Sequence, residues 1–178
     1  MPHELDTLPD GPGVHRASVL CDVPALQAFA FLADGFQLGT WALGAWDTQP
    51  VGDGVVRGRS LFDDQPGWVR PVGDAARLRI DYHVGGAPEA LTPRILATVE
   101  PLPADSANSV DSNGADRCRV TPHAARDPGM DDARWLRLVR CHEVEVLLIQ
   151  GRLAIAASAA ARAEADRTQS DPPRSSRP

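Results

Sequence analysis

The sequence predicts an α+β domain in which a curved antiparallel sheet of six or seven strands wraps around a long C-terminal helix. Three observations support this prediction. A strand and a short helix open the chain, a run of strand-like segments follows, and the last segment is one long helix free of proline. A curved sheet needs its concave face covered, and one long helix can lie across it. The 178 residues correspond to about one domain.

The first elements follow from alternation and from one proline. Residues 1–13 are polar and contain Pro and Gly, so we expect a flexible N-terminal arm. In residues 14–23 apolar and polar side chains alternate, which predicts a half-buried strand. Pro24 suits the first turn of a helix, and the apolar spacing after it predicts a short amphipathic helix that ends near Gly35.

Turn residues separate the strand-like segments in the middle of the chain. We expect strands over residues 41–47, 55–62, 68–72, 76–84, 92–100 and 117–123. The clearest period of two lies in residues 76–84, where apolar side chains alternate with charged residues and a histidine. One face of this strand should therefore pack inward and the other should be solvated. Residues 101–115 are small and polar and predict an irregular loop within the last hairpin.

The segment after residue 130 predicts one long helix. Residues 133–165 contain no proline and a single glycine. At about 100° per residue, one stripe of this helix includes Trp135, Leu138, His142 and Ile149. Glu145 lies at the edge of the same stripe, so a histidine and a glutamate three residues apart share the face that should pack on the sheet. We expect a single domain over residues 14–165 and a disordered tail over 166–178.

Three pieces of the sequence carry a resemblance to a known fold family. The first is Val23-Pro24-Ala25 running into Phe29 and Leu32, the second is the hairpin Val51-Gly52-Asp53-Gly54-Val55-Val56-Arg57-Gly58, and the third is the long amphipathic helix. Over residues 14–158 the chain resembles the START-like helix-grip superfamily, also called SRPBCC. Its members include polyketide cyclases and aromatases, lipid-transfer domains and many bacterial proteins. The resemblance implies an elongated cavity between sheet and helix that holds an apolar or aromatic molecule, and no universal catalytic residues.

Such a cavity defines a set of candidate ligand-binding residues. They are Trp41, Trp46, Tyr82, Arg94, Trp135, Leu138, His142, Glu145 and Ile149. The catalytic residues are unknown, and the candidates are His142, for proton transfer, and Glu145, which would fix the tautomer of the imidazole. The alternative is that His142 and Glu145 form a structural pair bonded to an arginine or to the backbone. The aromatic residues can equally be core residues, and Arg94 can equally lie at the rim.

Composition excludes several classes of function. All 18 basic residues are arginine, so lysine Schiff-base chemistry is impossible. The net charge of -6 argues against nucleic-acid binding, and we expect no membrane span, because no uninterrupted apolar run approaches the ~20 residues required. The three cysteines lack metal-site spacing, no third metal ligand accompanies His142 and Glu145, and no nucleotide-binding motif is present. We therefore expect no metal and no cofactor, and a cytoplasmic location because no signal peptide is visible.

Three hypotheses of function remain. The leading one is a cytoplasmic protein that binds a small hydrophobic or aromatic molecule between sheet and helix. The first alternative is an enzyme of the polyketide cyclase, aromatase or dehydratase type that uses the same cavity. The second alternative is an interaction module that works through the back of the long helix. Val144, Leu147, Leu148 and Ile155 lie away from the stripe that packs on the sheet, which suggests a homodimer through this helix.

Overall fold

The computed structural model describes residues 13–103, 117–126 and 128–170. The described residues form eight strands and three helices. The strands are β1 (Val14–Arg16), β2 (Val19–Cys21), β3 (Trp46–Gly52), β4 (Val55–Arg59), β5 (Pro66–Asp74), β6 (Arg79–Gly85), β7 (Thr92–Leu102) and β8 (Arg117–Ala125). The helices are α1 (Ala25–Ala33), α2 (Gly35–Leu38) and α3 (Asp132–Ser170). The expected arm over residues 1–12, the loop from residue 104 to 115 and the tail from residue 171 lie outside the described residues.

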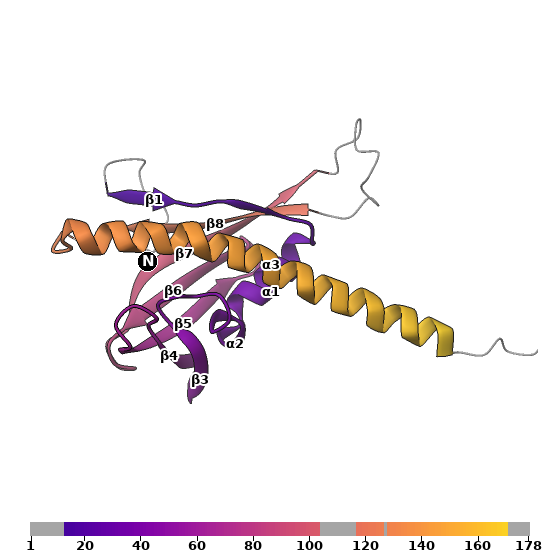
Figure 1. Ribbon diagram of the computed structural model, residues 1–178, viewed down its shortest axis with the longest axis horizontal. Helices are drawn as coiled ribbons and strands as arrows, with labels where there is room; N and C mark the ends of the chain where they lie inside the picture. The colour runs from indigo at the N-terminus through magenta and orange to yellow at the C-terminus, as the bar shows by residue number, and fades with distance from the viewer. Residues whose placement is uncertain (1–12, 104–116, 127, 171–178) are drawn as a thin grey trace, which may run out of the picture.

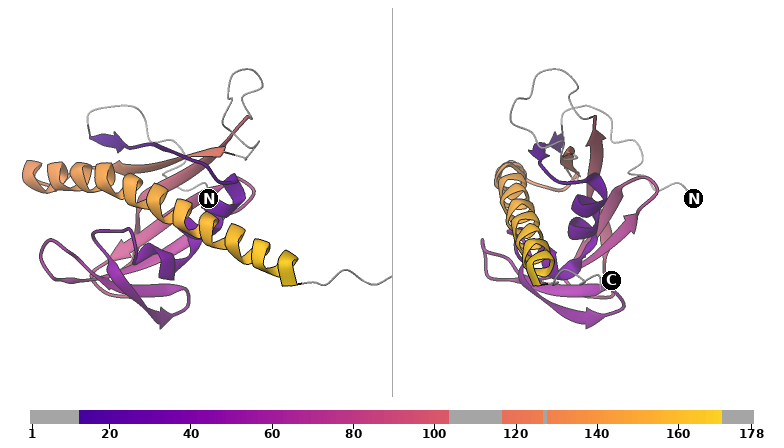
Figure 2. Two further views of the ribbon diagram at one scale, coloured as in Figure 1. Left: turned by 45° about the vertical axis from the view of Figure 1, so that its right-hand side comes forward. Right: turned by 90° about the vertical axis from the view of Figure 1, so that its right-hand side faces the viewer.

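All strand pairs are antiparallel, and the sheet has the order β1-β8-β7-β6-β5-β4-β3, with β2 also paired to β8. Two views show the sheet curling around the helix (Figure 2). The architecture is the predicted one. The strand expected over residues 14–23 is divided into β1 and β2, because it lies opposite Pro122 in β8. Pro122 accepts a hydrogen bond from the Ala17 N–H through its carbonyl but has no N–H to donate in return.

Three other strand predictions were displaced at their ends. The strand expected over residues 55–62 ends at Arg59. Residues 41–45 form turns rather than a strand, and β3 begins only at Trp46. Here the Leu43 N–H bonds to a side chain of α3, and the Asp47 N–H bonds to the Gly39 carbonyl. Residues 75–78 also form a turn, with Leu78 at a φ of 50°, so the alternation of β6 starts at Arg79.

The outer face of β6 is less solvated than its alternation predicts. The Arg79 side chain is only 11% exposed, and its Nη2 donates to Asp81 Oδ1 at 2.9 Å. On the next strands, His123 Nε2 lies 3.1 Å from Thr98 Oγ1, and the Arg16 Nε–H donates to His123 Nδ1. This polar layer screens the Arg79–Asp81 pair from water.

Helix α3 crosses the concave side of the sheet and extends beyond it (Figure 1). The core lies between the two, with Leu32, Ile80, Val120, Ile149 and Leu153 fully buried. The helix continues past residue 165, where the tail was expected to begin, as far as Ser170. By length and composition it is also the one described helix apolar enough to cross a membrane. Its 18-residue window has a mean hydropathy of 1.5 and is 22% buried, and the core helix of a soluble domain passes the same criterion.

Candidate ligand-binding cavity

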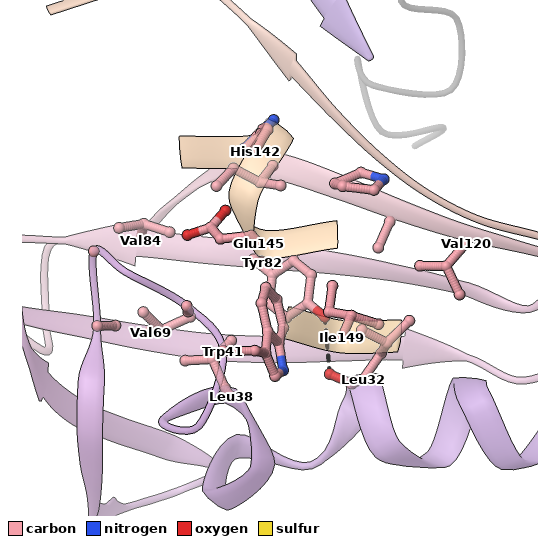
Figure 3. Close-up of a pocket in the computed structure, with 16 residues that line it drawn as sticks. Leu32, Leu38, Trp41, Val69, Tyr82, Val84, Val120, His142, Glu145 and Ile149 are labelled. Atoms are coloured by element: carbon pink, nitrogen blue, oxygen red, sulfur yellow. Dashed lines mark hydrogen bonds between the residues drawn. The ribbon is translucent and has the colours of Figure 1, made fainter. Parts of the chain in front are cut away.

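A cavity of about 110 Å³ lies between the sheet, α3 and the segment that follows α2 (Figure 3). It is smaller than the roughly 150 Å³ cavity that accepts a benzene-sized guest, so it has room for at most one small ring. The wall is almost entirely apolar and includes two ionisable side chains from α3. The lining residues are Leu32, Leu38, Trp41, Ala42, Gly44, Ala45, Val69, Tyr82, Val84, Ile95, Ala97, Val120, Pro122, His142, Glu145 and Ile149.

Glu145 is a carboxyl group buried in the cavity wall. The residue is 7% exposed, and its Oε1 accepts a hydrogen bond of 2.8 Å from the Leu43 backbone N–H. Oε2 has no hydrogen-bond partner among the described residues, and Figure 3 shows the carboxyl group directed toward Val84. Burial raises the pKa of Glu145 to about 7, and the Leu43 N–H opposes that shift in part. The bond to the Leu43 backbone agrees with the alternative prediction that Glu145 is a structural group. The second oxygen, Oε2, remains available to a ligand.

His142 is more deeply buried than Glu145 and is 2% exposed. Its Nδ1 has no hydrogen-bond partner among the described residues, and its ring packs against His15 with 5.6 Å between centroids. Burial, together with smaller effects from the nearby His15 and His123, lowers the pKa of His142 to about 4. No hydrogen bond joins His142 to Glu145 in the described structure, so Glu145 does not fix the tautomer of the imidazole. At neutral pH the imidazole is uncharged.

Tyr82 and Trp41 form the aromatic part of the wall. The Tyr82 hydroxyl donates to the Leu32 carbonyl at 2.9 Å, which ties α1 to the middle of the sheet. Because this proton is used and burial raises the pKa of Tyr82, the hydroxyl stays protonated. The Trp41 ring meets the Tyr82 ring edge-on, with centroids 5.9 Å apart. Trp41 Nε1 has no hydrogen-bond partner among the described residues.

The structure brings together five of the nine candidate ligand-binding residues: Trp41, Tyr82, His142, Glu145 and Ile149. The other four do not line the cavity. Trp46 lies on β3, which is the edge strand of the sheet, and Arg94 is exposed because its neighbour Ile95 faces inward. Trp135 and Leu138 are partly buried in the first turns of α3, before the helix reaches the cavity.

Sequence reasoning missed two groups of lining residues. Val69, Ile95, Val120 and Pro122 come from neighbouring strands. The period of two along β8 predicts that Val120 faces inward, and the same period along β7 and β8 could have identified Ile95 and Pro122. Leu38 is the last residue of α2, and Ala42, Gly44 and Ala45 come from the segment after it, where a strand was predicted, so no pattern assigned them. Among the described residues, no group of three or more His, Cys, Asp or Glu side chains could hold a metal ion.

The sequence matches no family model and no curated protein. Several solved structures are similar in fold. The Zhui aromatase/cyclase from Streptomyces sp. R1128 has a TM-score of 0.53 at 17% identity, over 79% of this chain and 93% of that one. The di-domain ARO/CYC BexL from the BE-7585A biosynthetic pathway has a TM-score of 0.53 at 18% identity, over 78% of this chain and 45% of that one. A conserved protein from Geobacillus kaustophilus has a TM-score of 0.54 at 10% identity, over 80% of this chain and 96% of that one.

These similarities concern the fold, since all three identities are low. In this chain the fold consists of the curved antiparallel sheet, the short helices after the first strands and the long C-terminal helix. The chain therefore shares the helix-grip fold of these structures.

Proposed function

We propose that this protein binds a small, uncharged hydrophobic or aromatic molecule that carries one hydrogen-bond donor, in the cavity beneath α3. The observation that carries this proposal is the free Oε2 of Glu145 in an otherwise apolar wall. Oε2 faces the cavity with no hydrogen-bond partner among the described residues, and a ligand O–H or N–H would supply the bond that it lacks in this apolar wall. We also propose a cytoplasmic location for the protein.

The remaining wall supports the choice of an aromatic or compact apolar ligand. Trp41 and Tyr82 present ring surface, and the uncharged His142 adds a third flat side chain. A cationic ligand would meet only one ionisable oxygen, half of whose charge is lost near neutral pH. An anionic ligand would be repelled by Glu145. Proton transfer by His142 has less support, because its pKa is near 4 and Nδ1 has no partner to orient the ring.

Native mass spectrometry on the protein as purified, and again after organic extraction, tests whether it retains a ligand. Phenol and toluene then form a matched pair of probes that differ only in the hydrogen-bond donor. We expect phenol to bind at least 10-fold more tightly than toluene, because a hydrogen bond to a charged acceptor is worth about 1.5 kcal/mol or more. The readout is a calorimetric titration or the fluorescence of Trp41 and its neighbours.

Glu145→Gln supplies the matched variant. It keeps an oxygen for the Leu43 N–H and loses the carboxylate charge, so the preference for phenol should shrink while toluene binding is unchanged. Equal affinity of the native protein for the two probes would contradict the role of Glu145. Failure of both probes to bind, together with an empty protein in the mass spectrum, would overturn the proposal as a whole.

We further propose that the exposed back of α3 packs against a second copy of this chain in a homodimer. Val144, Leu147 and Ile155 are 46%, 61% and 65% exposed and lie on one face with Gly151. An antiparallel pair of helices related by a two-fold axis at Gly151 would place Leu147 of each copy opposite Ile155 of the other. Light scattering after size exclusion tests this, and a monomer at micromolar concentration would overturn it.

A further inference from the structure

Two cysteines lie directly opposite each other on neighbouring strands, away from the ligand-binding cavity. Cys21 in β2 and Cys118 in β8 are register partners, and they are 1% and 0% exposed. Directly opposite residues of antiparallel strands have Cα atoms about 4.5–5.5 Å apart, within the range of about 4.4–6.8 Å that a disulfide spans. A disulfide therefore requires little movement of the backbone.

The environment gives the two thiols different roles. The neighbouring Cys21 thiol lowers the pKa of Cys118, whereas the Cys118 thiol and burial raise the pKa of Cys21. Cys118 is thus the thiol that ionises first, and only a thiolate is a good nucleophile. Cys141 on α3 is different, because burial raises its pKa to about 11 and it has no cysteine opposite.

We propose that Cys21 and Cys118 form a reversible oxidation site, at which a peroxide converts the dithiol into a disulfide that links β2 to β8. The Cys118 thiolate attacks one oxygen of hydrogen peroxide, the O–O bond breaks, and a sulfenic acid and hydroxide form. The Cys21 sulfur then attacks the sulfenic sulfur, the S–O bond breaks, and the departing hydroxide takes a proton and leaves as water. In total, two thiols and one peroxide give one disulfide and two waters. A small thiol such as dithiothreitol reverses the change.

The position of β2 gives the oxidant access to these buried side chains. β2 has three residues and pairs only with β8 among the described strands. Among the described residues, the backbone of β2 also accepts a hydrogen bond from α3, in which Gln150 Nε2 donates to the Leu20 carbonyl at 2.7 Å. Short strands at the margin of a sheet open at low free energy, so β2 can separate locally and expose both sulfurs without global unfolding.

The disulfide would close a loop that contains every element from α1 to β7. These elements include most of the cavity wall, but neither cysteine lines the cavity. Closing a loop of this length should raise the midpoint of thermal unfolding by roughly 10 °C. Ligand affinity should stay the same. This inference is independent of the proposed ligand-binding function.

The test uses the full chain, reduced and then treated under native conditions with a small excess of hydrogen peroxide. Thiols are counted after denaturation, and the cross-linked peptide is identified by mass spectrometry. We expect the count to fall from three to one, a peptide joining Cys21 to Cys118, the higher unfolding midpoint, and recovery of three thiols with dithiothreitol. Retention of three thiols, or oxidation without that cross-link, would overturn the proposal.

Two variants make the assignment specific. Cys141→Ser is the matched control and should still lose two thiols with the same rise in the unfolding midpoint. Cys118→Ser should lose the rapid reaction with peroxide and gain no stability from it. If Cys118→Ser does not fold, the peptide map of Cys141→Ser decides alone, because its only two thiols are the proposed pair. A rise in stability that persists in Cys118→Ser would also contradict the proposal.

Discussion

The two parts of α3 differ in environment although both are rich in apolar residues. In the part that crosses the sheet, His142, Glu145, Val146, Ile149 and Leu153 are buried. From residue 154 to residue 167, every side chain is exposed except that of Ala157, which is partly buried. The difference lies in what is beneath the helix, because this second part extends beyond the sheet (Figure 1). Apolar composition thus shows which residues can be buried, and the extent of the sheet decides which are.

The exposed part depends on local forces to remain helical. It is rich in alanine, the residue with the highest helix propensity, and it extends a helix whose first turns are already fixed. Arg167 and Glu164 form an ion pair on this surface, and such exposed pairs contribute little. We therefore expect substitutions in the two parts to have very different effects on stability.

Ile149→Ala and Ile155→Ala form the most direct test of this difference. Ile149 is 1% exposed, so its truncation should lower the free energy of unfolding by about 3 kcal/mol through lost burial and a new void. Ile155 is 65% exposed, and its truncation should change that free energy by less than about 0.5 kcal/mol. Urea denaturation at low protein concentration measures both. A large loss in Ile155→Ala would show that this face is covered in solution.

The pH dependence of stability should report on Glu145 in the buried part. Its pKa is about 7 in the folded chain and 4.5 in the reference state. Between these values the folded state holds a proton that the unfolded state has lost. The contribution of Glu145 is therefore fully present below pH 4.5 and is lost as the pH rises to about 7. The loss should be at most about 3.5 kcal/mol, at roughly 1.4 kcal/mol for each pKa unit.

His142 should act in the opposite direction and mask this effect in the native protein. Its pKa falls from 6.5 to about 4 on folding, so its contribution is complete above pH 6.5 and is lost as the pH falls to about 4. Urea midpoints from pH 4 to 8 should therefore be compared with those of Glu145→Gln and His142→Gln. Relative to native protein, Glu145→Gln should gain stability as the pH rises, and His142→Gln should gain stability as it falls. Parallel profiles would contradict both shifts.

Tyr82→Phe should have a smaller effect. It removes the bond of 2.9 Å to the Leu32 carbonyl but leaves the ring in place, so the free energy of unfolding should fall by about 1 kcal/mol. The carbonyl then lacks its buried donor, and α1 should become more mobile against β6. Hydrogen exchange of the α1 amides measures this, and the amides of residues 154–167 should not change. Faster exchange at residues 154–167 as well would show that the exposed part of α3 is coupled to the packing of α1 on the sheet.

The sequence predicted the fold well because its signals are periodic and local. Alternation in β6 and the stripe on α3 identified Tyr82, His142, Glu145 and Ile149 as inward-facing. The segment 41–45 was predicted wrongly, because its turns depend on a bond between the Leu43 N–H and Glu145, residues far apart in the sequence. The helical stripe alone could not show that Trp135 and Leu138 lie before the cavity. That boundary depends on how the strands are placed beneath the helix.

Pairing between distant strands was equally invisible in the sequence. The sequence contains three cysteines without close spacing, and all three are free in this structure. Only the antiparallel register of β2 and β8 places Cys21 opposite Cys118. A period of two predicts which face a side chain occupies but not which residue lies across from it.

Gly151→Ala examines the junction between the two parts of α3. Gly151 is exposed, and a Cβ placed there would have no heavy atom within 4 Å beyond the helix itself. In a monomer, alanine should raise the free energy of unfolding by about 0.5–1 kcal/mol, because it favours the helix and reduces the freedom of the unfolded chain. In the proposed dimer, the helices cross at Gly151, so the added methyl group should weaken self-association. Urea denaturation and light scattering on the same samples separate these effects. A destabilised monomer would mean that another part of the chain covers Gly151.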